Sequence, residues 1–159
     1  MAARQSKLSA RERALGWLTR REYAAGELAD RLLRTGFAQD EVEKLVFDLQ
    51  QQGLQSDERF AEVFCRHRVG QSYGPLRIRA EMRSRGVEAE LVDHHLKQIE
   101  ADWFELATEL CRHRYGADPV TDLKEKSRRY RYLSNRGFTA EQVQHAIKYA
   151  AADPTQDQS

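Results

Sequence analysis

Two cysteine–histidine pairs are the residues of this chain best suited to metal chemistry. Cys65 lies two positions before His67, and Cys111 lies two positions before His113. Residues two apart on a helix point to nearly opposite sides, so neither pair can hold one ion between its side chains. The adjacent histidines, His94–His95, fail on the same geometry. We therefore expect a buried cysteine beside a solvated histidine in each pair, and neither a metal nor another cofactor.

Catalytic patterns are missing from the sequence as well. It contains no serine in a strand–turn–helix setting, no glycine-rich phosphate loop and no His-Glu-x-x-His motif. The carboxylates are scattered along predicted solvent faces, and the two cysteines form no disulfide framework. We predict that the chain is not an enzyme.

Charge is segregated along the chain, although 26 basic residues nearly balance 25 acidic ones and the net charge is +1. Seven acidic residues from Asp40 to Glu62 oppose two basic residues. Six arginines from Arg66 to Arg85 oppose one glutamate, and six basic residues from Lys124 to Arg136 also oppose one glutamate. Such basic stretches attract phosphate groups or acidic protein surfaces, so the charge pattern favours a binding function.

The first basic stretch supplies five candidate partner-binding residues: Tyr73, Arg77, Arg79, Arg83 and Arg85. On a helix, Arg77 and Arg79 lie about 200° apart and splay to two sides, whereas Arg79 and Arg83 share one face. Tyr73 stands at the start of that helix, where it can stack or form a hydrogen bond. The alternative is that these are ordinary solvated arginines whose stems cover apolar surface.

The second basic stretch mixes basic residues with the aromatic rings of Tyr130 and Tyr132. This interleaving is typical of nucleic-acid surfaces, although a solvated helix face is an equally good interpretation. The candidate partner-binding residues here are Lys126, Arg128, Arg129 and Arg131.

The elements that position these residues follow a threefold repeat of about fifty residues. Gly36, Gly86 and Gly137 each follow an apolar residue by four positions, precede another directly, and have a valine six positions later. Each glycine is predicted to end one helix in the left-handed conformation before the next helix begins. Repeated units of this kind stack on their neighbours, which favours a binding surface over a single pocket.

The predicted fold is all-α, with three tandem three-helix repeats forming an elongated, curved array. We expect helices at about 10–20, 24–35, 39–52, 57–72, 76–85, 88–99, 103–115, 123–136 and 140–151. The predicted domains are 8–52, 53–100 and 101–152, followed by a disordered tail at 153–159. The aromatic residues predicted to lie in the core are Phe60, Phe64, Trp103 and Phe104.

The location and assembly of the chain follow from simpler signals. No apolar run approaches the length of about 18 residues that spans a bilayer, and residues 1–11 show no signal-peptide pattern. We expect a cytoplasmic protein without a membrane segment. We also expect a monomer, although glycine-containing turns leave open the exchange of a unit between two chains.

Residues 56–61 (Ser-Asp-Glu-Arg-Phe-Ala) contain an Asp-x-x-Phe-Ala motif, and residues 73–82 (Tyr-Gly-Pro-Leu-Arg-Ile-Arg-Ala-Glu-Met) contain a Gly-Pro-x-x-Ile motif. In these two segments the chain resembles the RecX family of bacterial recombination regulators. The glycine turn follows in the right order, and the resemblance extends from about Leu8 to Ala151. The chain departs from the family's usual pattern at Ala38, where Ser or Thr is common, and at Met82, where Leu is common.

The resemblance implies a helical protein that binds the RecA recombinase, mostly as a filament on single-stranded DNA. It also implies inhibition of the recombinase's ATPase, strand-exchange and coprotease activities, and thereby modulation of DNA repair and of the SOS response. Filament capping, groove filling and disassembly all remain open as mechanisms. The competing hypothesis is a nonspecific nucleic-acid-binding helical module with weak direct DNA binding, and a third is a passive scaffold that leaves ATP turnover unchanged.

Overall fold

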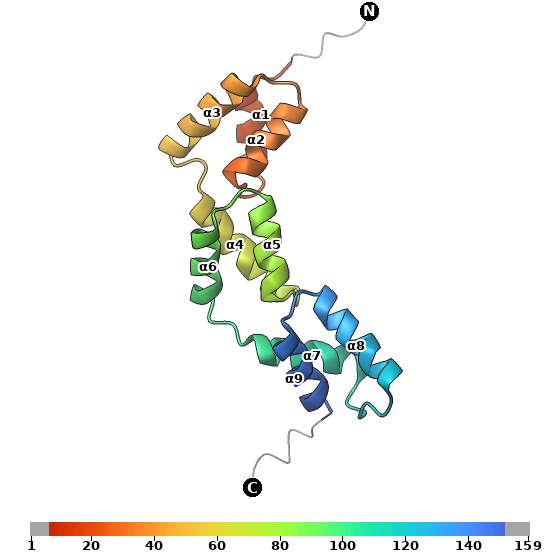
Figure 1. Cartoon of the computed structure of the whole chain (residues 1–159). Coiled ribbons are helices and arrows are strands. Elements are labelled where there is room, and N and C mark those ends of the chain that lie inside the picture. Colours follow the sequence, from red (N-terminus) through yellow and green to blue (C-terminus); the bar gives the residue numbers. More distant parts are fainter. Residues whose placement is uncertain (1–6, 152–159) are drawn as a thin grey trace, which may run out of the picture. The chain divides into compact units, whose positions relative to one another are not determined.

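The computed structural model describes residues 7–151, and this part of the chain contains helices and no strand (Figure 1). The helices are α1 (Ala10–Leu18), α2 (Ala25–Arg34), α3 (Gln39–Gln51), α4 (Asp57–Gly70), α5 (Pro75–Ser84), α6 (Ala89–Gln98), α7 (Trp103–Tyr115), α8 (Leu123–Asn135) and α9 (Ala140–Tyr149). All nine lie where the sequence predicts them, with ends that differ by one or two residues. The predicted disordered tail at 153–159 lies outside the described residues.

Side-chain caps begin several of these helices. The Ser9 hydroxyl accepts a hydrogen bond from the Glu12 backbone N–H at 3.1 Å. At α9, Thr139 and Gln142 form a reciprocal capping box. Ala38, the residue that departs from the family pattern, gives α3 no side-chain cap. Local capping therefore explains where these helices start, and α3 begins without it.

The three repeated glycines end their helices in the way that the sequence predicts. Gly36, Gly86 and Gly137 have φ angles of 102°, 87° and 99°, in the left-handed region. After α2, the Gly36 N–H donates to the Leu33 carbonyl at 3.0 Å and the Phe37 N–H donates to the Leu32 carbonyl at 3.4 Å. The same pair of bonds recurs after α5 and after α8, which makes all three Schellman turns.

The described residues divide into two compact units. The first unit holds residues up to 64 together with 82–92, and the second holds 65–81 together with residues from 93 onward. Because these limits fall inside α4, α5 and α6, each of those helices contributes residues to both units. The predicted limits of three domains remain a prediction.

Each unit has its own apolar core. In the first unit, α1, α2 and α3 pack together (Figure 1) around a core that includes Leu28, Leu32 and Leu49. In the second unit, α9 packs on α7 and α8 around a core that includes Leu133 and Val143. These core positions have the apolar helical spacing that the sequence shows.

The predicted aromatic core positions have mixed outcomes. Phe60 is buried at 3% exposure, which confirms its prediction, whereas Phe64 and Trp103 are only partly buried. The prediction for Phe104 was wrong, because 40% of this residue is exposed. Its ring lies 5.2 Å from the ring of His145, so it covers the side of α9 rather than entering the core.

Candidate functional site

Tyr73, at the start of α5, is surrounded by arginines of the second unit. The guanidinium groups of Arg136, Arg77 and Arg68 lie 3.9, 4.3 and 5.2 Å from the centre of its ring. Glu81 forms ion pairs with Arg68 at 2.8 Å and with Arg77 at 3.1 Å. Both Tyr73 and Arg77, predicted as partner-binding residues, therefore take part in a network within the protein itself.

A second set of bonds joins this region to the end of α8. The Gly74 N–H donates to the Arg136 carbonyl at 2.7 Å, and the Leu76 N–H donates to the Gly137 carbonyl at 2.9 Å. The Arg136 side chain donates in return to the carbonyls of Gln71–Ser72. We call the contact between residues 71–76 and Arg136–Gly137 the second junction. Its backbone hydrogen bonds fix the start of α5 against the turn after α8.

The first unit contains a related contact. Arg85 forms an ion pair with Glu27 at 3.3 Å, and its guanidinium lies 4.7 Å from the ring centre of Phe64. Beside this pair, Gly26 at the start of α2 lies directly against Gly86. We call the contact between Gly26–Glu27 and Arg85–Gly86 the first junction. Arg85, another predicted partner-binding residue, thus holds two segments of the first unit together.

The remaining candidates on α5 also have partners. Arg79 forms an ion pair with Asp93, and 46% of the Arg79 side chain is exposed. Arg83 donates a hydrogen bond to the Val87 carbonyl at 2.8 Å. An exposed ion pair of this kind contributes little to stability, so Arg79 can exchange Asp93 for an external partner at small cost.

Arg129 occupies a different environment from the other basic residues of α8. It is buried, with 6% of the residue exposed, and forms an ion pair with Glu125 at 3.2 Å. Its guanidinium also donates to the Asp118 carbonyl at 3.4 Å and lies 5.1 Å from the ring centre of Tyr115. These contacts tie the loop before α8 to the helix, and they direct the charge of Arg129 inward.

Lys126, Arg128 and Arg131 form the exposed basic row of α8. The only ion pair recorded for this row within the described residues is Arg128 with Glu125 at 3.8 Å, and 70% of the Arg128 side chain is exposed. Lys126 and Arg131 also line a shallow pocket of about 480 Å³. The row therefore presents three cations to solvent from one rigid helix.

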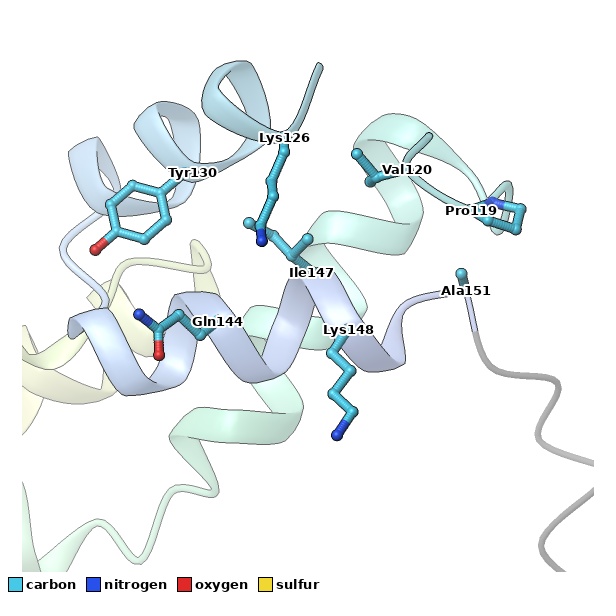
Figure 2. Close-up of a pocket in the computed structure, with 8 residues that line it drawn as sticks. All are labelled: Pro119, Val120, Lys126, Tyr130, Gln144, Ile147, Lys148 and Ala151. Carbon is cyan, nitrogen blue, oxygen red and sulfur yellow. The ribbon is translucent and has the colours of Figure 1, made fainter. Parts of the chain in front are cut away.

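A neighbouring hollow of about 590 Å³ extends this surface onto α9. Figure 2 shows Lys126 and Tyr130 reaching into it from α8, with Gln144 and Ile147 on α9 opposite them. Lys148 adds a second cation from α9, although its side chain points away from Lys126 (Figure 2). Gln144 and Lys148 are not among the residues predicted from the sequence, although their exposed spacing on α9 could have indicated them.

The cysteines and histidines behave as the sequence predicts. Cys65 and Cys111 are buried, and His67 and His113 are exposed. Burial raises the pKa of Cys65 to about 11. Burial also raises the pKa of Cys111, against the opposing effect of the positive charges of two nearby arginines. Within residues 7–151, no group of three or more His, Cys, Asp or Glu side chains is placed to hold a metal ion.

No helix between residues 7 and 151 combines the length and the apolar character that crossing a membrane requires.

Comparison with known protein families finds three matches in succession along the chain. Residues 10–48 match the family model described as RecX, first three-helix domain, residues 56–96 match the second three-helix domain, and residues 100–147 match the third. Together these matches cover most of the chain.

Individual proteins give the same result. The chain is 41% identical to Regulatory protein RecX of Chromohalobacter salexigens over 140 residues, which cover 88% of this chain and 91% of that protein. It is 42% identical to Regulatory protein RecX of Halorhodospira halophila over 143 residues, which cover 90% of this chain and 88% of that protein.

Solved structures show a similar fold. RecX from Lactobacillus salivarius matches with a TM-score of 0.71 at 19% identity, covering 89% of this chain and 94% of that one. A second crystal structure, of regulatory protein RecX, matches with a TM-score of 0.72 at 24% identity, covering 87% of this chain and 70% of that one.

Proposed function

Since the chain belongs to the RecX family, we propose that its regulatory role is to bind the RecA recombinase, chiefly as a filament on single-stranded DNA. Binding inhibits the recombinase's ATPase, strand-exchange and coprotease activities, and so modulates DNA repair and the SOS response. The chain acts in the cytoplasm as a monomer, by contact and without a reaction or cofactor of its own.

The observation that carries this proposal is the ordered match of all three family domains along one chain. A polymer offers the same binding site on each of its subunits, and three linked helical domains can contact more than one subunit. A second contact within the same complex adds effective concentration, so affinity for a filament can exceed affinity for a free subunit by a large factor.

The nine predicted partner-binding residues divide into two roles in this proposal. The residues proposed to contact the partner directly are Arg79, Lys126, Arg128 and Arg131, which are exposed. The residues proposed to hold the surface in place are Tyr73, Arg77, Arg83, Arg85 and Arg129, whose partners lie within the protein. This division makes α8 the better place to test the proposal, because the one ion pair of its exposed cations within the described residues is the long, exposed contact of Arg128 with Glu125, which contributes little to stability.

The test is the ATPase of the recombinase on single-stranded DNA with increasing amounts of this protein. We expect the combined change Lys126→Gln, Arg128→Gln and Arg131→Gln to raise the concentration needed for half inhibition about tenfold, which corresponds to ~1.4 kcal/mol. The matched control is Arg20→Gln, Lys44→Gln and Lys97→Gln, which removes the same charge from exposed positions elsewhere. Equal inhibition by the two variants would rule out α8 as the contact surface.

The amount of protein required separates the possible mechanisms. Inhibition at far less than one copy per several recombinase subunits supports filament capping or destabilisation. A requirement for near-stoichiometric protein supports filling of the filament groove. Absence of any effect on ATP turnover at saturating protein contradicts the proposed function and favours the passive scaffold.

The second candidate function is a nonspecific nucleic-acid-binding module, and the exposed basic row of α8 favours it. Its affinity for bare single-stranded DNA would fall steeply with salt, in proportion to the number of phosphates neutralised. Titration of the protein against bare DNA and against the recombinase filament, at two salt concentrations, distinguishes the two functions. Equal affinity for both would favour the module.

A further inference from the structure

A pocket of about 300 Å³ in the first unit brings together four arginine side chains and two carboxylates. It is lined by Arg21, Tyr23, Glu27, Asp30, Arg31, Arg34, Ser84 and Arg85. Four guanidinium groups therefore face two carboxylates, which leaves an excess of two positive charges. A concave site with excess positive charge raises the local concentration of anions.

Arg31 is held in this pocket by aromatic rings. Its guanidinium lies 4.2 Å from the ring centre of Trp17 and 5.8 Å from that of Tyr23. One of its terminal nitrogens donates to the Tyr23 hydroxyl. The side chain is nevertheless exposed. Stacking thus fixes the plane of a guanidinium whose remaining N–H groups stay available to a ligand.

Glu27 is already occupied by the other two arginines. Arg21 binds both of its carboxylate oxygens at 3.0 Å, and Arg85 binds one of them at 3.3 Å. The hydrogen bond to Glu27 raises the pKa of Arg21 above its ordinary value. Because Glu27 is engaged in this way, it cannot also neutralise Arg31 or Arg34.

Arg34 is the second cation left available. It is exposed on the last turn of α2, and within residues 7–151 no hydrogen bond or ion pair engages its side chain. Asp30 is one turn earlier and is exposed. The small cavity therefore offers the pre-oriented guanidinium of Arg31 and the guanidinium of Arg34, which forms no hydrogen bond or ion pair within the described residues.

From this geometry we propose that the pocket is a phosphate-binding site that receives a backbone phosphodiester of single-stranded nucleic acid. The N–H groups of Arg31 and Arg34 match the oxygens of a phosphate group, which can accept from more than one guanidinium at once. Glu27 already supplies the carboxylate that pairs with the other two arginines of the pocket, so the phosphate binds Arg31 and Arg34. The carboxylate of Asp30 at the rim repels a bound phosphate group. This repulsion is stronger for a phosphate monoester, which carries a charge of about −1.5 to −2, than for a phosphodiester, which carries one negative charge.

The corresponding place in the second repeat lacks this site. Tyr23 and Tyr73 each lie thirteen residues before the repeated glycine, so their surroundings can be compared directly. Where the first repeat has Arg31, the second has Glu81, and that carboxylate pairs with two arginines of its own unit. The second repeat therefore lacks the phosphate site, and the residues of the site are distinct from the basic row of α8.

Direct binding of a fluorescent oligothymidylate of about 20 nucleotides, with no recombinase present, tests this site. We expect Arg34→Gln to weaken binding about fivefold and to reduce the salt dependence by about one phosphate contact, equally for oligothymidylate and oligocytidylate. Arg20→Gln removes an exposed arginine outside the pocket and should change binding less than about twofold. Arg34 makes no hydrogen bond or ion pair within residues 7–151, so the variant is expected to fold, which its thermal unfolding checks.

Trp17 provides a second readout beside Arg31. The chain has two tryptophans, so Trp103→Phe leaves Trp17 as the sole indole. We expect the Trp17 fluorescence of the Trp103→Phe protein to change when the oligonucleotide is added. The change should be much smaller when Arg34→Gln is combined with Trp103→Phe. Unaltered DNA affinity of Arg34→Gln overturns the proposal, and so does tighter binding of a phosphoserine peptide than of the oligonucleotide. These results do not depend on inhibition of the recombinase, which the α8 variants measure separately.

Discussion

The two junctions have the same Arg-Gly pair, but different forces hold them. At the first junction, Arg85 reaches Glu27 through an ion pair between side chains. At the second, Arg136–Gly137 accepts backbone hydrogen bonds from Gly74 and Leu76, and the Arg136 side chain binds carbonyl groups. One sequence pattern therefore supports two kinds of contact. The stability of the first junction should depend on salt concentration, whereas the stability of the second should depend on changes in backbone shape.

The largest expected effect comes from Gly74→Ala at the second junction. A Cβ atom at Gly74 would lie 2.3 Å from the Gly137 carbonyl carbon and 2.4 Å from the Phe138 nitrogen. Backbone atoms cannot move aside as a flexible side chain can, so the junction must separate. We expect a loss of about 3–4 kcal/mol in the free energy of unfolding, measured by urea titration.

Two other glycines control this experiment. Gly16→Ala adds a Cβ atom in α1 that meets no atom within 4 Å, so we expect a gain of up to about 1 kcal/mol from helix propensity. Gly26→Ala at the first junction would place a Cβ atom 2.6 Å from the Arg85 carbonyl oxygen. It should cost less than Gly74→Ala, because one backbone atom rather than three lies within 3.0 Å of the added Cβ atom. A smaller loss for Gly74→Ala than for Gly26→Ala would reverse the comparison.

The next effect appears at alkaline pH and belongs to the second unit. Both cysteines lie in that unit, and burial raises the pKa of Cys65 to about 11. An unfolded thiol ionises near pH 8.5, so deprotonation favours the unfolded state between about pH 8.5 and 11. The stability contributed by the protonated thiol is present below this range and is lost as pH rises through it.

Cys65→Ala isolates that contribution from the titration of tyrosines and lysines. We expect the parent protein to lose about 2–3 kcal/mol more than Cys65→Ala between pH 8 and pH 11, measured by denaturant titration at each pH. The double variant Arg136→Gln with Cys65→Ala also lacks the thiol, so it should likewise show no loss of stability from thiol ionisation. Parallel stability curves for parent and Cys65→Ala would show that the thiol does not remain buried in the folded unit.

The helices and their turns could be predicted from the sequence because their signals are local. Ser9 and Thr139 act as caps within four residues of the bonds that they form, and Gly36 acts on the turn in which it lies. The repeat spacing then places the other two turns. The family resemblance also rests on contiguous motifs, so the fold class and its three-helix organisation follow from the sequence.

The environments of individual arginines could not be predicted, because they depend on residues outside the helix or turn in which each arginine lies. Arg129 looks like any other basic residue of α8, but its partners include the Asp118 carbonyl and the Tyr115 ring on other segments. The pocket of the first unit joins Arg34 on α2 to Arg85 some fifty residues later. Helical spacing predicts on which face of its helix a residue lies, but it does not predict which other segments of the chain cover that face.

The ion pair at the first junction supplies the last and smallest of these tests. Only 17% of the Glu27 side chain is exposed, and its removal leaves Arg21 and Arg85 without their carboxylate. We expect Glu27→Gln to cost about 1–2 kcal/mol at low salt, between the values for exposed and buried pairs. High salt screens the pair, so this cost should shrink in about 1 M NaCl.

Arg136→Gln is the matched change at the second junction, and its partners are neutral carbonyl groups. Hydrogen bonds to neutral groups depend little on ionic strength, so we expect its cost of about 1–2 kcal/mol to persist in about 1 M NaCl. Stability measured for both variants at low and high salt decides the matter. If both costs shrink together, the two junctions share one electrostatic mechanism, and the backbone hydrogen bonds of Gly74 and Leu76 contribute less than their geometry indicates. If only the cost of Glu27→Gln shrinks, the Arg-Gly pair has been used twice with different chemistry, and only the first junction is sensitive to the ionic surroundings of a nucleic acid.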